Sequence, residues 1–322
     1  MHIIGIDLGT SKICGVAYDI DRNQIAYANR LNDSTITTFN NWEKIQNPQR
    51  IYELVEQILS EFTSKFQDII GIGITGQMHG ILYVDDNGEP LSPLYTWQDG
   101  RGNLIYHDGQ TYASFLSSKT KYMMASGYGI VTHFYNIKNN LVPEKAKKIC
   151  TIMDFVSMKL SENKIPISDS TNLASLGFFD IANLKFDDEK LIRCGINPSI
   201  LPEISRADEK IGYFRGSIPV FTAIGDNQAS FLGSISDLKK SILINIGTSG
   251  QISAFYEEFI KVDNLELDIR PFPGGGFILV GASLCGGNSL NILKGLFEDT
   301  LQTFCGCGLK TDIFFSIANS IN

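Results

Sequence analysis

Residues 3–19, IIGIDLGTSKICGVAYD, have the pattern of two β-strands joined by a short turn. Apolar residues alternate with small or polar ones on both sides of the central LGTSK, as expected for a β-hairpin. A second stretch at 242–258, ILINIGTSGQISAFYEE, repeats the order of an apolar strand, a Gly-Thr-Ser turn and an alternating strand. This long-range repeat predicts a duplicated domain in which each copy opens with a hairpin.

The spacing of the two hairpins predicts how far the second copy extends. Their turn glycines are Gly9 and Gly247, which are 238 residues apart (247 − 9). A second copy as long as the first would bring the chain to roughly 480 residues, whereas the sequence has 322. We therefore expect a first domain over 1–238 and the incomplete beginning of a second over 239–322. A half-built sheet is expected to leave open edges and exposed apolar faces.

The composition is typical of a globular protein that binds neither nucleic acid nor membrane. Hydrophobic residues make up 43% of the chain and charged residues 19%, which allows a large core. The net charge of −8 gives no general attraction to phosphate backbones or anionic lipid, and no apolar run is long enough to span a bilayer. The six cysteines are scattered, as in reduced proteins, so we expect a cytoplasmic location. A homodimer is compatible with the sequence.

Helix and strand patterns alternate between the two hairpins, which predicts an α/β fold. A buried strand is expected at 69–74 and another at 220–224. An amphipathic helix is expected before them, because four apolar residues are spaced i, i+3, i+4 and i+7: Ile51, Leu54, Val55 and Ile58. In such folds ligands bind at the carboxyl ends of the strands.

The turn DLGTSK at 7–12 has the composition of a phosphate-binding loop. Gly9 lets the backbone approach a ligand, and successive N–H groups with the hydroxyls of Thr10 and Ser11 can hold phosphate oxygens. Asp7 would repel phosphate unless a divalent cation lay between them, so we expect it to bind Mg²⁺. A tight hairpin whose turn is capped by Asp7 is the alternative.

Polar residues also follow other predicted strands and turns. TGQMHG at 75–80 places Gln77, Met78 and His79 at a strand end, where the histidine contacts substrate or is satisfied in the core. TWQDGRG at 96–102 is either a sugar-binding surface or a buried tryptophan beside a turn; its candidates are Trp97, Asp99 and Arg101. SDSTNLAS at 168–175 is either a helix cap or a loop that reads hydroxyls.

The stretch FTAIGDNQASFL at 221–232 places Asp226 after a predicted strand and before a predicted helix. A carboxylate there can cap the helix or accept a proton from a substrate hydroxyl, and the stretch alone favours neither. The two turns that resemble phosphate loops favour the second role, because phosphoryl transfer needs a base within reach of the attacking oxygen.

Taken together, these motifs resemble the FGGY carbohydrate kinases of the actin/hexokinase/Hsp70 ATPase superfamily. GIDLGTSK, GITGQMHG, TWQDGR, GDNQAS and NIGTSG occur here in the order and at the intervals of that family. Within it, TWQDGR, ASGYGIVTHFYNIK, STNLASLGFFD and GASLCGGNSLNIL are most similar to sedoheptulokinases. GQMHG and GDNQA are equally similar to xylulokinases.

The resemblance implies an actin-like ATPase (ribonuclease H-like) fold with duplicated domains, the second truncated. It also implies phosphorylation of the terminal hydroxyl of a ketose by ATP and Mg²⁺, with sedoheptulose as the first expectation and xylulose or another sugar as the alternative. Asp226 matches the family's catalytic base, and Asp7 matches the residue that positions Mg²⁺ and the phosphates. The other matches are the first phosphate loop (Gly9, Thr10, Ser11 and Lys12), the second (Gly247, Thr248 and Ser249), the ketose contacts (Met78, His79 and Asn227) and nearby pocket residues (Trp97, Asp99 and Arg101).

The sequence departs from the family in one respect. The adenine-binding glycine motif of the family lies beyond residue 322, so we expect the chain as it stands to phosphorylate poorly or not at all. A non-catalytic protein that has kept the sugar pocket is the alternative of a different class. An actin-like assembly or chaperone ATPase is a third, which would not need the Met78-His79 pair.

Overall fold

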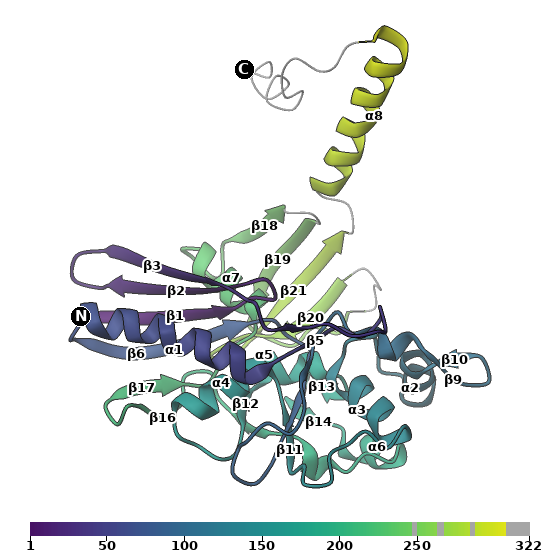
Figure 1. The fold of residues 1–322 in the computed structure, drawn as a ribbon, viewed down its shortest axis with the longest axis horizontal. Helices are drawn as coiled ribbons and strands as arrows, with labels where there is room; N and C mark the ends of the chain where they lie inside the picture. The colour runs from purple at the N-terminus through teal and green to yellow at the C-terminus, as the bar shows by residue number, and fades with distance from the viewer. Residues whose placement is uncertain (247–249, 263–266, 284–286, 307–322) are drawn as a thin grey trace. The chain divides into compact units, whose positions relative to one another are not determined.

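The computed structural model describes residues 1–246, 250–262, 267–283 and 287–306, and these form two compact units (Figure 1). The first unit consists of Met1–Gly233 with two short segments, Glu257–Phe259 and Arg270–Phe277. The second consists of Ser234–Tyr256, Ile260–Ile269 and the residues from 278 onward, within the described ranges.

The first unit is built on a six-stranded sheet with the strand order β16-β17-β6-β1-β2-β3. The predicted hairpin is confirmed: β1 and β2 pair antiparallel, with Asp7 opposite Cys14 and Leu8 opposite Ile13. β6 lies parallel to β1 on its other side, and β17 lies parallel to β6. The strands are β1 (His2–Leu8), β2 (Lys12–Asp19), β3 (Gln24–Leu31), β6 (Ile69–Gly76), β16 (Lys210–Phe214) and β17 (Ile218–Phe221).

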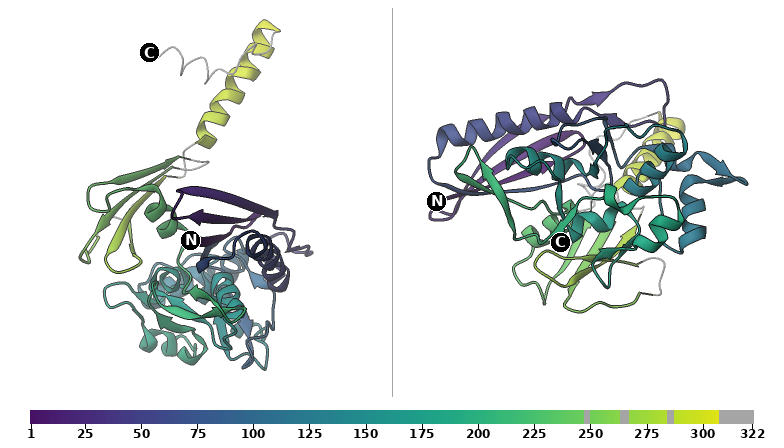
Figure 2. Two further views of the ribbon diagram at one scale, coloured as in Figure 1. Left: turned by 90° about the vertical axis from the view of Figure 1, so that its left-hand side faces the viewer. Right: turned by 90° about the horizontal axis from the view of Figure 1, so that it is seen from below.

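Two helices cover one face of this sheet, α1 (Pro48–Lys65) and α4 (Ile152–Leu160), and α1 runs along the strands in Figure 2. α1 begins where the side chain of Asn47 accepts hydrogen bonds from two backbone N–H groups and Pro48 supplies a preset first turn. The predicted apolar stripe is its buried face, which packs on alternate residues of the strands: Ile51, Leu54, Val55 and Ile58 on the helix, and Ile4, Ile6, Ile13 and Ile72 on the sheet.

The opposite face of the sheet is largely open within this unit. Ile3, Tyr27 and Leu31 are exposed there, and a Cβ added at Gly5 or Gly73 would meet no atom within 4 Å. A hollow of about 510 Å³ on this face extends from Ile3 to Asp7 and Ala229.

Small strands and helices form a second layer of the first unit around an aromatic core. This core contains Tyr83, Phe134, Phe178 and Leu116, all fully or almost fully buried. The strands are β4 (Thr35–Ile36), β5 (Ile45–Gln46), β7 (Leu82–Val84), β8 (Leu94–Tyr95), β9 (Ile105–His107), β10 (Gln110–Thr111), β11 (Lys148–Cys150), β12 (Ile167–Asp169), β13 (Phe179–Asp180), β14 (Lys185–Phe186) and β15 (Glu203–Ser205). The helices are α2 (Tyr112–Thr120), α3 (Gly129–Lys138), α5 (Ser170–Leu173), α6 (Asp188–Arg193) and the 3₁₀ segments η1 (Gly100–Asn103), η2 (Ala174–Leu176) and η3 (Pro198–Ile200), with α7 (Asp226–Ser234) after β17.

The second hairpin predicted from the repeat is also present. β18 (Ile242–Ile246) and β19 (Gly250–Tyr256) pair antiparallel, with Asn245 opposite Gln251. They belong to a four-stranded sheet of order β18-β19-β21-β20, with β20 at Leu267–Pro271 and β21 at Phe277–Ser283, and α8 (Gly287–Cys305) follows. The predicted turn residues Gly247, Thr248 and Ser249 lie outside the described residues.

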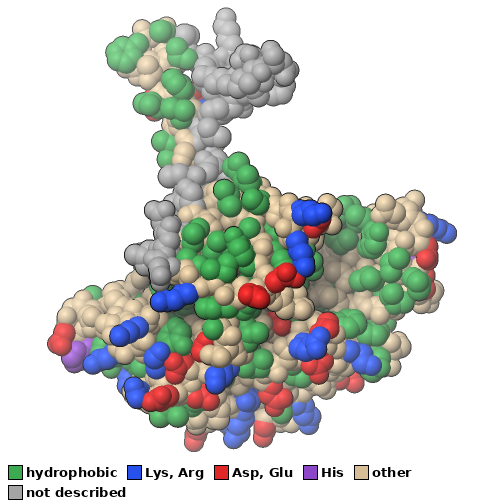
Figure 3. Space-filling model, turned by 180° about the vertical axis from the view of Figure 1, so that it is seen from behind, with side chains coloured by type: hydrophobic (Ala, Val, Ile, Leu, Met, Phe, Trp, Pro, Cys, Tyr) green, Lys and Arg blue, Asp and Glu red, His purple; other side chains and the backbone are tan. Residues whose placement is uncertain are grey.

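Two global features agree with the composition. On the face shown in Figure 3, basic and acidic side chains are interspersed. In the described part of the chain, none of the helices has the length and apolar character needed to cross a bilayer.

Candidate functional site

Asp226 is the first residue of α7, and the loop that carries it is fixed to the neighbouring strand. Between β17 and α7, the Ile224 N–H donates to the carbonyl of Ile74 (3.1 Å), and the Thr75 hydroxyl donates to the carbonyl of Ile224 (2.9 Å). Both partners belong to the carboxyl end of β6, where the α/β pattern predicted a ligand site. An acidic residue at a helix N-terminus is also favoured by the helix dipole.

The surroundings of the Asp226 carboxyl group raise its pKa. Desolvation by the surrounding protein raises its pKa to about 6, and the negative charge of Asp7 adds to this, against the Asn227 N–H and Arg270, which lower it. Its side chain still reaches solvent. An accessible carboxylate with this pKa is ionised at neutral pH and is a stronger base than an ordinary aspartate.

Asp7 lies at the end of β1, opposite Thr75 of β6. Burial raises the pKa of Asp7, and the negative charge of Asp7 contributes to the raised pKa of Asp226. Asp7, Ile224 and Ala229 of α7 line the same hollow on the open face of the sheet. The structure therefore places the two predicted catalytic residues, from the two ends of the first unit's sequence, at the same edge of the sheet, because Asp7 pairs with Thr75 and Thr75 bonds to the loop before Asp226.

The turn between β1 and β2 has its carbonyl groups occupied by the protein. The Asn32 side chain donates to the Gly9 carbonyl (3.0 Å) and its backbone N–H to the Ser11 carbonyl (3.0 Å), while Gln46 donates to the Thr10 carbonyl (2.9 Å). A carbonyl oxygen would repel phosphate, so these bonds favour an anion at the amide edge of the turn. Lys12, the last predicted residue of the loop, is exposed.

We expect the change Asn32→Ala to destabilise the turn. It leaves the Gly9 carbonyl and the Ser34 N–H, both bonded to the Asn32 side chain, without these partners, at a cost of roughly 1–3 kcal/mol for buried groups. Urea unfolding measures the loss. Asn29→Ala is the matched control, because Asn29 is an exposed asparagine in β3, which ends just before Asn32; equal stability of the two variants would contradict this role for Asn32.

A ring of hydrogen bonds joins the turn to two predicted substrate residues. The Trp97 indole donates to the Thr10 hydroxyl (3.0 Å), which donates to Gln77 (3.3 Å). Gln77 donates to Gln46 (2.9 Å), and Gln46 closes the ring at the Thr10 carbonyl. A cavity of about 270 Å³ adjoins the ring, with Thr10, Gln46 and Lys44 in its wall. Gln46 had no signal in the sequence beyond a polar side chain in a short strand.

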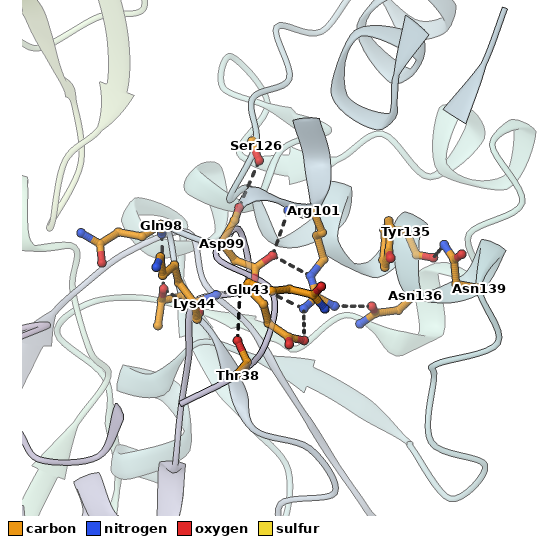
Figure 4. A network of polar contacts seen from close by, with 12 residues as sticks. Thr38, Glu43, Lys44, Gln98, Asp99, Arg101, Ser126, Tyr135, Asn136 and Asn139 are labelled. Carbon is orange, nitrogen blue, oxygen red and sulfur yellow. Dashed lines mark hydrogen bonds and ion pairs between the residues drawn. The ribbon is translucent and has the colours of Figure 1, made fainter. Parts of the chain in front are cut away.

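Asp99 and Arg101 are almost completely buried and bind each other (Figure 4). The Arg101 Nε donates to Asp99 (2.6 Å) and one Nη to Asn136 (2.7 Å), while the guanidinium lies 4.1 Å from the centre of the Tyr95 ring. Asp99 also accepts the Lys44 backbone N–H (3.0 Å). Their polar atoms are engaged inside the protein, so this geometry favours a bracing role behind Trp97 over direct contact with a substrate.

His79 and Met78 lie on the loop after β6. His79 has a backbone φ of 71°; its Nδ1 bonds to the Ser175 carbonyl (2.7 Å) and its ring stacks on Tyr128. A carbonyl accepts only, so Nδ1 carries the proton and Nε2 of the neutral ring has the lone pair. A Cβ added at Gly225 would lie 2.8 Å from the Met78 sulfur, so the Met78 side chain packs directly against the residue before Asp226.

Asn227 and Gln228 each have a buried side-chain oxygen that no described residue satisfies. Gln228 does donate through its Nε2 to the Pro271 carbonyl (3.0 Å). Unsatisfied buried oxygens are uncommon, and next to Asp226 they are suitable acceptors for ligand hydroxyl groups. This agrees with the prediction that Asn227 contacts a sugar, which remains a prediction.

Mg²⁺ fits the donors present. The described residues contain no cluster of three or more histidine, cysteine or acidic residues, and Mg²⁺ seldom needs one, because it is usually bound by one or two carboxylates together with water and phosphate oxygens. Asp7, at the end of β1 and directly before the turn, provides such a carboxylate.

Comparisons with known proteins all point to the same family. The model of the N-terminal domain of the FGGY family of carbohydrate kinases matches residues 2–233. A xylulose kinase of Lactococcus lactis is 27% identical over 320 residues (94% of this chain, 62% of that protein), and the Mus musculus sedoheptulokinase is 30% identical over 302 residues (83% and 60%). The chain thus spans less than two thirds of the length of these relatives.

Solved structures share the fold. A ligand-bound xylulose kinase from Lactobacillus acidophilus superposes with a TM-score of 0.78 at 22% identity, covering 91% of this chain and 62% of that one. A Plasmodium falciparum glycerol kinase with ADP gives 0.74 at 22% identity, covering 91% and 63%. The predicted α/β fold of the actin-like ATPase type is confirmed.

Proposed function

Because the chain belongs to the FGGY family of carbohydrate kinases, we propose that the protein transfers the γ-phosphoryl group of ATP to the terminal hydroxyl of a ketose. The observation that carries the proposal is Asp226: an accessible carboxylate at a helix start, with a pKa raised to about 6. In this proposal the nucleotide phosphates approach Asp226 from the side of Asp7 and the β1–β2 turn.

In the proposed reaction Asp226 accepts the proton of the sugar hydroxyl as its oxygen attacks the γ-phosphorus of ATP. The bond from the γ-phosphorus to the bridging oxygen breaks, and ADP leaves. Bound with the nucleotide, Mg²⁺ would neutralise charge on the phosphates, with Asp7 as its protein ligand. The backbone N–H groups of Gly9, Thr10, Ser11 and Lys12 hold phosphate oxygens, and by the repeat Gly247, Thr248 and Ser249 form the second phosphate loop.

We propose sedoheptulose as the sugar, with xylulose as the alternative. The relatives include kinases named for each of them. Asn227 follows Asp226 directly, and the Met78 side chain lies close to Gly225. In this proposal His79 binds the same sugar, and the half-exposed Trp97 offers an apolar ring for its C–H face. The buried Asn227 oxygen, which has no hydrogen-bond partner among the described residues, would accept a hydrogen bond from a sugar hydroxyl.

An ATP-consumption assay tests the proposal with sedoheptulose, xylulose, ribulose, gluconate and glycerol. It is run on residues 1–322 and on the natural full-length protein if that is longer, with sugar binding measured by calorimetry in parallel. We expect turnover with a ketose and the highest kcat/KM with sedoheptulose. Absence of turnover with every sugar would contradict the kinase function, and sugar binding without turnover would favour the non-catalytic alternative.

A further inference from the structure

One short segment contacts both loops that carry the proposed reacting groups. This support segment, residues 170–176, comprises α5 and η2. It holds the loop of Asp226 through Thr171 and the loop of His79 through Ser175. The side chains of the segment that make these contacts are more than nine-tenths buried, so the segment does not present them to a ligand.

Thr171 holds the residue directly before Asp226. Its hydroxyl oxygen accepts the Gly225 N–H at 3.1 Å, across 54 residues of sequence. Thr171 has no exposed surface, and its own N–H donates to the Asp169 carboxylate at 2.8 Å. The Gly225 N–H is buried as well, so loss of its acceptor would leave a donor without a partner.

Ser175 holds His79 by two bonds. Its hydroxyl accepts the His79 backbone N–H (3.1 Å), and its carbonyl accepts the proton on the ring Nδ1 (2.7 Å). The Ser175 hydroxyl in turn donates to the carbonyl of Asn172 (2.7 Å). Ser175 therefore fixes the tautomer of the ring, and together with the stacked Tyr128 it fixes the ring's orientation.

Asn172 anchors the support segment in the core. Its side-chain amide donates to the Thr151 hydroxyl (2.8 Å) and to the Asp154 carboxylate (3.0 Å), and all three residues are fully buried. Thr151 and Asp154 form the capping box that begins α4. The support segment is thus joined to a helix that packs on the central sheet.

We infer that Thr171 and Ser175 are positioning residues that fix where Asp226 and His79 lie relative to each other. Thr171 acts on the base through the Gly225 N–H, and Ser175 acts on the histidine. The catalytic meaning of this inference rests on the proposed function, whereas the contacts themselves do not. Misplacing a reacting group by about 1 Å can cost roughly 100-fold in rate, so these hydroxyls are expected to affect turnover without touching substrate.

Thr171→Val tests the inference, because valine keeps the shape of the side chain and removes the hydroxyl. Thr171→Ser keeps the hydroxyl and is the rescue variant. Thr120→Val is the matched control, because the buried Thr120 hydroxyl donates to the Leu116 carbonyl in α2, which holds neither loop. Hydrogen exchange at the Gly225 amide, kcat, and the KM for the sugar are measured for each variant.

In the unmodified protein we expect the Gly225 amide to be protected from exchange. Thr171→Val should abolish that protection and lower kcat at least tenfold with little change in sugar KM. Thr171→Ser should restore both, and Thr120→Val should leave both unchanged. If Thr171→Val fails to fold, two measurements still test the inference. They are the exchange protection of the Gly225 amide in the unmodified protein, and the amide protection and kcat of Thr171→Ser.

Two results would overturn the inference. One is a Gly225 amide that exchanges in the unmodified protein as fast as in an unfolded peptide. The other is unchanged kcat in a folded Thr171→Val variant of an active protein. If no sugar is phosphorylated, the proposed function fails on its own, while amide exchange still reports whether Thr171 holds the loop.

Discussion

Asp226→Asn is expected to lower kcat by roughly 10²- to 10⁴-fold, the range typical of a lost general base. Asparagine has nearly the same shape, but it cannot take the proton of the sugar hydroxyl. Sugar affinity should change little, because Met78, His79 and Asn227 remain. Kinetic assays with the preferred ketose, together with calorimetry of sugar binding, give both quantities.

The pH dependence supplies an independent test of the same residue. The base must be ionised to work, and its pKa is raised to about 6, so kcat/KM should fall as pH drops through about 6. This acid limb should be missing from the residual activity of Asp226→Asn. A limb unchanged in that variant would assign the titration to another group.

Ionisation of Asp226 is expected to help activity but to lower the stability of the folded state. The folded-state pKa of Asp226 lies above the ordinary value of 3.8, so the folded state binds this proton more tightly than the unfolded state does. The ionised carboxylate therefore works against folding above pH 6, and its protonation favours folding as pH falls from 6 towards 4. Asp226→Asn should be at least as resistant to heat as the parent protein at pH 7.5. A near-parental kcat in that folded variant would contradict the catalytic role.

Arg101→Ala is expected to cause the largest loss of stability, about 3–5 kcal/mol, as is usual when one partner of a buried ion pair is removed. Asp99, which is 1% exposed, would lose the guanidinium that pairs with it, and the Oδ1 of Asn136 would lose its donor. The space over the Tyr95 ring would also become a cavity. Thermal and urea unfolding measure the change.

Two controls separate the ion pair from a general effect of removing arginine. Arg193→Ala removes an exposed arginine whose partner, Glu189, is four residues away on α6, and should have little effect. Arg101→Lys keeps the charge but loses the planar fork, so we expect it to recover only part of the stability. A loss for Arg101→Ala as small as that for Arg193→Ala would show that the buried network contributes little.

Local patterns predicted the elements of the fold well. Alternation along 3–19 and the helical spacing from Ile51 to Ile58 depend only on neighbours in sequence, and both elements form as expected. The repeat at 242–258 added the second hairpin, because two copies of one pattern need no knowledge of tertiary contacts.

The site was less predictable, because its contacts join segments far apart in sequence. Gln46 and Asn32 bind the β1–β2 turn from 36 and 23 residues away, and Thr171 binds Gly225 across 54. A polar side chain in a strand or short helix carries no mark of such a partner. In TWQDGRG, adjacency suggested a shared surface, but Asp99 and Arg101 turn inward while Trp97 is 47% exposed.

The bond between the Trp97 indole and the Thr10 hydroxyl also has a spectroscopic consequence. The chain contains two tryptophans, and the other, Trp42, lies near the buried Arg101 guanidinium. A chain carrying Trp42→Phe would keep a single tryptophan, Trp97, partly in water and bonded directly to the β1–β2 turn, which we propose binds phosphate. Its emission wavelength and its quenching by iodide would then report on occupation of the turn, so nucleotide binding could be followed without a coupled enzyme, a label or any turnover.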